Sequence, residues 1–226
     1  MIDKMTADGT FAKVQEIYLE RDAMDGMQSF SVNDWDRTKI AFELFFTART
    51  IIDIGIGQGQ LVSLFCEAPH VIDVIAIDRK KHSKLIEPRS KKYKYYEFDI
   101  TEPFPNDLPK SDITIAMEVF EHIDVNKLKK VVESAKNSSK RRMLFASVPF
   151  KEKHPLYHHN KPYGHKQSFD ETVLVENFGP KTIWTNFRNR WYLIFSADNI
   201  EHPGEKSLED FLGSASYLFQ TSSAHY

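Results

Sequence analysis

The sequence has little of the features that would place a protein outside the cell or in a membrane. Its 226 residues include a single cysteine, Cys66, so the chain cannot form an internal disulfide. It contains no run of eighteen apolar residues, and its polar start, MIDKMTADGT, is unlike a secretory signal. We therefore expect a protein of a reducing compartment, the cytoplasm, with no membrane partner.

An excess of charge of either sign is also missing. The 30 basic and 32 acidic side chains leave a formal net charge of −2, so no overall field attracts nucleic acid. Basic residues are concentrated locally, with eight Lys or Arg in residues 79–94 and seven in 127–142. Such stretches could follow a phosphate backbone, although surface lysines are most often only solvated.

What is present is the composition and periodicity of an α/β protein. Hydrophobic residues are 41% of the chain, which is enough for a full core in one domain. From residue 50 onward, short apolar runs alternate with polar, helix-like segments, which predicts parallel strands joined by crossover helices. The sequence predicts five such strands, at 50–55, 71–78, 93–99, 111–118 and 142–150, and helices at 59–68, 80–90 and 125–137.

The two ends of the chain differ from this middle region. Residues 10–24 and a segment capped by Asn33 or Asp34 show helical spacing. Residues 168–179 read as a helix with a Ser168–Glu171 capping box, and the runs 181–187 and 191–198 read as an antiparallel hairpin. We expect one domain over 1–226, with a helical cap (1–49), a core (50–198) and a partly ordered tail (199–226).

A glycine-rich loop follows the first predicted strand. In DIGIGQGQL, residues 53–61, the glycines at 55, 57 and 59 allow a sharp turn and a close approach of ligand to backbone. The following helix adds free N–H groups at its start. The spacing is G-x-G-x-G, not the G-x-G-x-x-G of dinucleotide folds. Asp78, nineteen residues beyond Gly59, ends the second strand where an acid can accept hydrogen bonds from a ribose.

From these residues the sequence resembles the class I S-adenosylmethionine-dependent methyltransferases over residues 35–198. The segments IIDIGIGQGQL, VIAID, FDI, SDITIAMEVFEHI and MLFASVP resemble the ordered motifs of that family. The resemblance implies a doubly wound, mostly parallel seven-stranded sheet with an antiparallel last strand, and S-adenosylmethionine as cofactor. It implies cofactor contacts from Asp53, Gly55, Gly57, Gly59, Asp78, Asp99, Ile100 and Met117. In that scheme the glycines lie under the methionine part, Asp53 near its amino group, Asp78 on the ribose, Asp99 on the adenine amine, and Ile100 and Met117 against the adenine.

Three ionisable residues follow the fourth strand in IAMEVFEHID, residues 115–124. Glu118 ends the strand, and Glu121 and His122 come three and four residues later, a spacing that shares one face of a helical turn. Three interpretations remain open. The residues can stabilise the next helix, they can act as acid and base toward a methyl acceptor, or they can bind a divalent metal.

The metal interpretation has its own resemblance. E-x-x-E-H at this place is similar to the small-RNA 3′-end 2′-O-methyltransferases and to ubiquinone-pathway O-methyltransferases. In the RNA enzymes a further His after the fifth strand completes the metal site, and YGHKQSF supplies His165 here. The flanking pattern around that His matches only loosely. His165 belongs to a segment, 149–169, rich in His and Tyr, of a kind that is more often functional than not.

Together these features predict a methyltransferase that acts on an O or N nucleophile of a small-molecule or saccharide-like acceptor. We expect Glu121, His122 and His165 to be catalytic, with Glu118, Glu121, His122 and His165 as candidate ligands of a divalent metal. An RNA ribose 2′-O-methyltransferase is one alternative. A non-catalytic binding or structural protein that keeps the cofactor fold is another, although the intact glycine loop argues against it.

Overall fold

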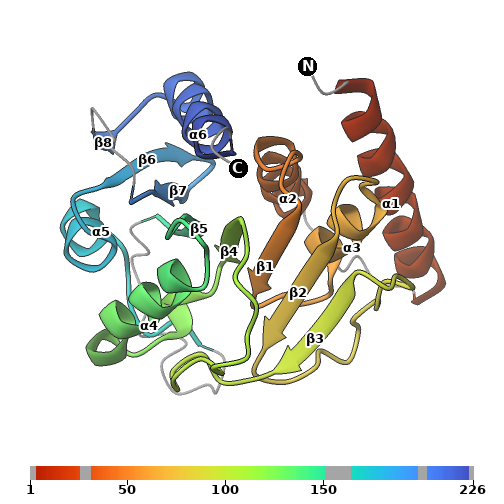
Figure 1. The fold of residues 1–226 in the computed structure, drawn as a ribbon, viewed down its shortest axis with the longest axis horizontal. Helices are drawn as coiled ribbons and strands as arrows, with labels where there is room; N and C mark the ends of the chain where they lie inside the picture. The colour runs from red at the N-terminus through yellow and green to blue at the C-terminus, as the bar shows by residue number, and fades with distance from the viewer. Residues whose placement is uncertain (1–3, 26–31, 151–163, 198–202, 224–226) are drawn as a thin grey trace. The chain divides into compact units, whose positions relative to one another are not determined.

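The computed structural model describes residues 4–25, 32–150, 164–197 and 203–223. The chain forms two compact units, Met1–Phe98 and Asp99–Tyr226, and each contains both strands and helices (Figure 1). None of the helices in the described part of the chain is long and apolar enough to cross a membrane. The sequence-based boundaries of cap, core and tail within one domain stay a prediction.

The first unit is a parallel sheet with helices packed on it. Its helices are α1 (Lys4–Asp25), α2 (Val32–Leu44) and α3 (Gln60–Glu67), and its strands are β1 (Thr50–Ile54), β2 (Asp73–Asp78) and β3 (Tyr93–Glu97). β2 pairs in parallel with both β1 and β3. The carboxyl ends of these strands therefore share one edge, at which β1 enters the glycine loop and β2 ends on Asp78.

The core of this unit explains the apolar runs in the sequence. Every residue of β1 is buried, as expected for a strand covered on both faces. Helix α3 packs on β1 and β2, and α1 and α2 pack on α3. Aromatic rings meet edge to face between these helices, with Phe42 5.2 Å from Phe65 and Tyr18 5.7 Å from Trp35. Burying side chains of this size stabilises a fold by about 1.5–3 kcal/mol each.

Helix boundaries in the first unit differ from the sequence predictions. Residues 80–90, predicted as a helix, form an irregular segment in which Ile86 N–H donates to the Gln58 carbonyl at 3.1 Å. Pro88 lacks an amide hydrogen and disfavours a helical residue before it, which explains the failure of the helix. Helix α2 begins at Val32, so Asn33 and Asp34 lie inside its first turn and neither is its cap.

The described residues of the second unit form five strands. They are β4 (Ile113–Met117), β5 (Leu144–Pro149), β6 (Thr182–Phe187), β7 (Arg190–Phe195) and β8 (Gly204–Glu205) in the spatial order β4-β5-β7-β6-β8. β4 and β5 are parallel, whereas β7 runs antiparallel to both β5 and β6. The helical elements are the 3₁₀ turn η1 (Phe120–His122), α4 (Val125–Asn137), α5 (Glu171–Phe178) and α6 (Leu208–Ser223).

The predicted hairpin is confirmed, and its turn has a simple cause. Arg188 and Asn189 connect β6 to β7 with φ angles of 51° and 60°. Two consecutive positive φ values are those of a type I′ turn, whose twist matches that of paired strands. The hairpin places Arg190 at the start of β7, opposite Pro149 of β5.

The cap of α5 and the number of strands differ from the sequence predictions. The cap of α5 is Asp170, whose carboxylate accepts from Val173 N–H at 2.9 Å, and not the Ser168–Glu171 pair. Residues 203–223 of the tail are regular, because Phe211, Ala215 and Phe219 of α6 are buried and the helix packs on β6. The described residues thus form eight strands, one more than predicted, with β8 pairing in parallel with β6.

Candidate functional site

The glycine loop has the backbone conformation that its sequence predicts. Gly55, Gly57 and Gly59 have φ angles of 72°, 55° and 88°, in the left-handed region that other residues rarely adopt. Gly55 N–H donates to the Ile77 carbonyl at 2.7 Å, which ties the loop to the end of β2. The loop is therefore held at the sheet edge where α/β folds bind their ligands.

The second and third glycines are needed for different reasons. A methyl group at Gly57 would meet no described atom within 4 Å, whereas one at Gly59 would lie 2.7 Å from Leu85 Cδ1 and 3.0 Å from the Ile86 carbonyl. Gly57 is therefore the position where a ligand can approach the backbone. Gly59 is glycine because the protein itself packs against it. The contact of the three glycines with the cofactor stays a prediction.

Two carboxyl groups accompany the loop. Asp53 of β1 is 4% exposed, and burial, with a smaller contribution from the nearby Asp78, raises its pKa well above the usual value. Burial also raises the pKa of Asp78, but backbone N–H groups of Lys80, Gly57 and Arg79 partly oppose the shift. The Gly57 N–H lies 3.4 Å from Asp78 Oδ2. A cation would stabilise the charged form of Asp53, and hydroxyl donors would satisfy Asp78.

Tyr18 is a residue of this region that the sequence did not single out for function. Its hydroxyl lies 3.0 Å from the Gln58 carbonyl and 3.2 Å from Ser63 Oγ, and the side chain is 1% exposed. The Gln58 carbonyl thus accepts from Tyr18 on α1 and from Ile86 in the irregular segment. The helical spacing of residues 10–24 indicates only an apolar helix face, and no local sequence pattern links Tyr18 to the glycine loop.

The predicted adenine-binding residues lie at two places in the second unit. Asp99 and Ile100 are at its start, and Met117 ends β4. The Asp99 carboxylate accepts from Thr101 N–H at 2.9 Å, which is the loop-capping role that such a residue has without a ligand. Ile100 is 8% exposed. Met117 is the last residue of β4 and is half-buried. Their contacts with a cofactor stay a prediction.

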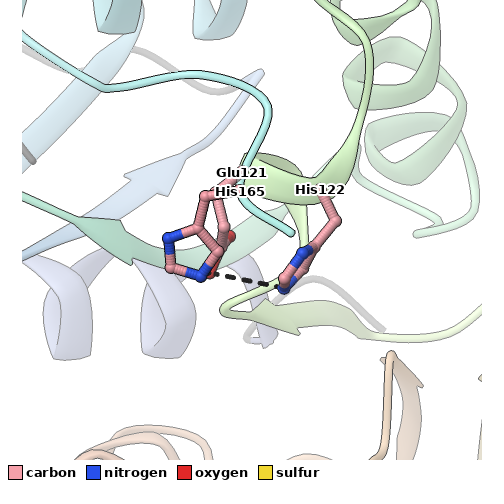
Figure 2. A group of neighbouring side chains, drawn as sticks. All are labelled: Glu121, His122 and His165. Atoms are coloured by element: carbon pink, nitrogen blue, oxygen red, sulfur yellow. Dashed lines mark ion pairs between the residues drawn. The ribbon is translucent and has the colours of Figure 1, made fainter. Parts of the chain in front are cut away.

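Glu121, His122 and His165 come together beyond the end of β4. His122 Nε2 and His165 Nε2 each lie 4.0 Å from Glu121 Oε1, and the two imidazole rings are 5.0 Å apart (Figure 2). The three ligand atoms lie within 4.8 Å of one another. The Glu121 side chain is 1% exposed, while those of His122 and His165 are 36% and 24% exposed. One face of the group is therefore open to solvent.

Local hydrogen bonds fix these residues. Lys166 N–H donates to the Glu121 carbonyl at 2.7 Å, and the Gln167 amide donates to the carbonyls of Phe120 and Ile123, both at 2.9 Å. His122 Nδ1 lies 3.4 Å from the Gly164 carbonyl. Gly164, Lys166 and Gln167, the described residues beside His165, are therefore bonded to η1 and to Ile123, which follows it.

Glu118 does not belong to this group. Its Oε1 accepts from Ser147 Oγ at 2.9 Å, and its Oε2 lies 3.1 Å from Arg190 Nε. The ligand cluster of the described residues consists of Glu121, His122 and His165 alone. The sequence predicted that Glu118 would converge with those three, and this part of the prediction is wrong because Glu118 is held by Ser147 and Arg190, which the sequence did not indicate as its partners.

The donor set of the cluster fits a divalent metal. One carboxylate and two imidazoles are ligands used by Zn²⁺, Fe²⁺ and Mn²⁺. Ligands at about 2.1 Å from one ion lie roughly 3–4 Å apart, so the 4.0 Å separations require only a small contraction. With three protein ligands, positions remain for water or substrate, as in catalytic metal sites.

His154, His158 and His159 of the His-rich segment, with Tyr157 and Tyr163, lie outside the described residues, so the prediction for them is untested.

No protein-family model and no curated protein matches the sequence. Solved structures share its fold. An S-adenosylmethionine-dependent methyltransferase from Clostridium acetobutylicum has a TM-score of 0.55 at 12% identity, covering 82% of this chain and 99% of that chain. An O-methyltransferase family protein from Burkholderia thailandensis has a TM-score of 0.56 at 14% identity, covering 73% of this chain and 55% of that chain.

The small RNA methyltransferase HEN1 has a TM-score of 0.54 at 16% identity, covering 78% of this chain and 27% of that chain. Likeness at such low identity establishes the fold and not the activity. The α/β, Rossmann-like methyltransferase fold expected from the sequence is thereby confirmed.

Proposed function

We propose that the protein is an S-adenosylmethionine-dependent methyltransferase whose acceptor is an oxygen or nitrogen nucleophile, with an oxygen favoured by the metal-type cluster. The observation that carries the proposal is the pairing of an open glycine, Gly57, with Asp53 and Asp78 at one sheet edge. A sulfonium cofactor carries an ammonium group and a ribose. Asp53 offers a carboxylate to the first and Asp78 to the second.

The shared fold supports this cofactor assignment. The proteins of the same fold from Clostridium acetobutylicum and Burkholderia thailandensis are named as methyltransferases, the first of them S-adenosylmethionine-dependent. G-x-G-x-G spacing also departs from the dinucleotide pattern. The rival assignment, a non-catalytic protein of the same fold, predicts no dependence of stability on the cofactor.

In the reaction, the protein's main contribution is to hold acceptor and methyl group at contact distance for in-line displacement. Glu121, His122 and His165 would hold a divalent metal. When bound there, the metal would lower the pKa of an acceptor hydroxyl. Without a metal, the two imidazoles, being partly exposed, could instead accept the acceptor's proton.

A thermal-shift titration tests the cofactor assignment. A ligand that binds only the folded state raises the melting temperature with its concentration. We expect S-adenosylhomocysteine to stabilise the protein and NAD to leave it unchanged. Asp78→Ala should weaken binding by about 1–3 kcal/mol through lost ribose hydrogen bonds. Stabilisation by NAD with no response to S-adenosylhomocysteine would contradict the proposal.

Chelation separates the metal-assisted mechanism from acid–base catalysis. With a metal, methyl transfer from labelled S-adenosylmethionine should stop in EDTA and return with Mn²⁺. Without one, EDTA has no effect on transfer, and the rate falls at low pH as the general base becomes protonated. In both cases Glu121→Ala should reduce transfer and leave S-adenosylhomocysteine affinity nearly intact.

A second candidate function is methylation of an RNA ribose 2′-hydroxyl. The Glu121–His122–His165 cluster favours it, because the sequence pattern of these residues is similar to that of small-RNA methyltransferases. The shared fold with the small RNA methyltransferase HEN1 agrees with it. Transfer to an RNA 3′-terminal ribose that fails after periodate removes the vicinal diol would favour this candidate over a small-molecule acceptor.

A further inference from the structure

Glu118 has a backbone conformation that is uncommon for its residue type. It follows the last residue of β4 with a φ angle of 55°, in the left-handed region that few residues other than glycine occupy. A residue stays in such a conformation only when the surrounding structure holds it there. Residues of this kind are concentrated at functional sites. The contacts of Glu118 therefore indicate what keeps the chain in this turn.

Contacts with β5 and β7 hold Glu118 in place. Its N–H donates to the Ser147 carbonyl at 2.9 Å, and its carboxylate accepts from Ser147 Oγ at 2.9 Å. The same carboxylate pairs with Arg190 Nε at 3.1 Å. Ser147 is fully buried, and the side chains of Glu118 and Arg190 are 16% and 25% exposed. The contact with Arg190 is an ion pair by distance, because Arg190 Nε makes no hydrogen bond with suitable geometry.

The turn at Glu118 determines where the cluster residues lie. Directly after it, His122 N–H donates to the Val119 carbonyl at 3.1 Å, which closes the 3₁₀ turn η1. Phe120 of that turn is fully buried and packs against Phe178 at 5.4 Å. Since Phe120 fixes one side of η1, the direction in which the chain leaves Glu118 sets how Glu121 and His122 face His165.

We propose that Arg190 and Ser147 are positioning residues, which hold Glu118 in its left-handed conformation and thereby align Glu121 and His122 for a divalent cation. The inference rests on the proposed function of the Glu121–His122–His165 cluster. In this proposal Glu118 supports the cluster and does not bind the cation. Arg190, the first residue of β7, acts through Glu118. The hairpin turn before Arg190 brings this side chain to the end of β4.

Cation affinity tests the proposal without requiring the acceptor. Mn²⁺ binding is measured from the loss of the free-ion electron paramagnetic resonance signal, at a temperature where every variant is folded. Arg190→Gln should weaken Mn²⁺ binding about tenfold, which is about 1.4 kcal/mol. Ser147→Ala should weaken it less, and Arg190→Lys should restore part of the loss. Arg188→Gln, an exposed arginine two residues away, is the matched control and should bind like the wild type.

S-adenosylhomocysteine affinity is measured on the same variants and should stay unchanged. Mn²⁺ affinity of Arg190→Gln within twofold of the wild type would overturn the positioning role. Equal loss of Mn²⁺ and S-adenosylhomocysteine binding would overturn it too, because it would indicate general damage to the fold. Wild-type protein that binds S-adenosylhomocysteine but no Mn²⁺ would overturn the cation centre itself, a separate failure of the proposed function.

Discussion

At the scale of single residues, Gly57 and Gly59 should respond differently to the same substitution. Alanine at either position adopts a left-handed backbone at a cost of about 1–2 kcal/mol. At Gly59 the new methyl group also meets Leu85 and Ile86, so Gly59→Ala should lower the melting temperature more. At Gly57 the methyl group occupies open space, so Gly57→Ala should mainly lose S-adenosylhomocysteine affinity. Calorimetry with and without ligand measures both, and identical behaviour of the two variants would contradict this assignment.

Asp53 gives a prediction about pH. Burial raises its pKa in the folded protein above the value of about 3.9 of an unfolded chain. The folded state therefore binds more protons between these two pKa values, and the free energy of unfolding falls as pH rises through that window. Asp53→Asn removes the cost of the buried charge, so the variant should be more stable than the wild type at neutral pH.

Urea unfolding between pH 4 and 8 measures this effect of Asp53→Asn. Asp73→Asn is the control, because Asp73 pairs with Lys94 at the edge of the unit and is not deeply buried. An equal slope of stability against pH in the wild type and Asp53→Asn would show that Asp53 is not the group responsible. The variant should also lose affinity for S-adenosylhomocysteine, whose ammonium group the carboxylate is proposed to meet.

At the scale of elements, Tyr18 links helix α1 to the glycine loop. Tyr18→Phe removes one of the two donors to the Gln58 carbonyl and leaves the ring in place. We expect a loss of about 1 kcal/mol in the free energy of unfolding, typical of one buried hydrogen bond. Tyr217→Phe on α6, where the residue is 67% exposed, is the matched control. Equal stability of the two variants would mean that the Tyr18 hydroxyl does not stabilise the loop.

At the scale of the whole molecule, the two basic stretches offer fewer charges than the sequence indicates. In the first, Lys81 pairs with Glu87, Lys94 pairs with Asp73, and Lys92 donates to carbonyls at the end of α3. In the second, Lys140 pairs with Asp112 and Arg142 with Glu133. Lys136 is buried and donates to the Phe178 carbonyl at 2.7 Å.

We therefore expect weak binding to single-stranded RNA with no sequence preference. A site with about four phosphate contacts would give a slope of log K against log salt of about −3, at roughly −0.7 per contact. Fluorescence anisotropy between 50 and 200 mM salt measures this slope. Tight binding with a much steeper slope would instead support RNA as the natural acceptor.

The sequence by itself determined the elements that depend on local pattern. Buried strands are recognisable because their apolar runs are short and bounded by turns, and the glycine loop because left-handed turns require glycine. Residues 80–90 were predicted wrongly because their packing against Gly59 and the effect of Pro88 outweigh helical composition. The helix over residues 208–223 was not among the predicted elements. Its burial depends on packing against β6, and no local sequence pattern indicates that contact.

The candidate site shows the same division. Glu121 and His122 are neighbours in the sequence, so their shared direction could be predicted, and the meeting with His165 was predicted only through resemblance to a family. The tertiary structure alone decided that Glu118 pairs with Arg190, 72 positions away, and that Gly59 faces protein. The physical reason is that strand register and hairpin geometry fix which distant side chains meet, and neither is encoded in the periodicity of a single segment.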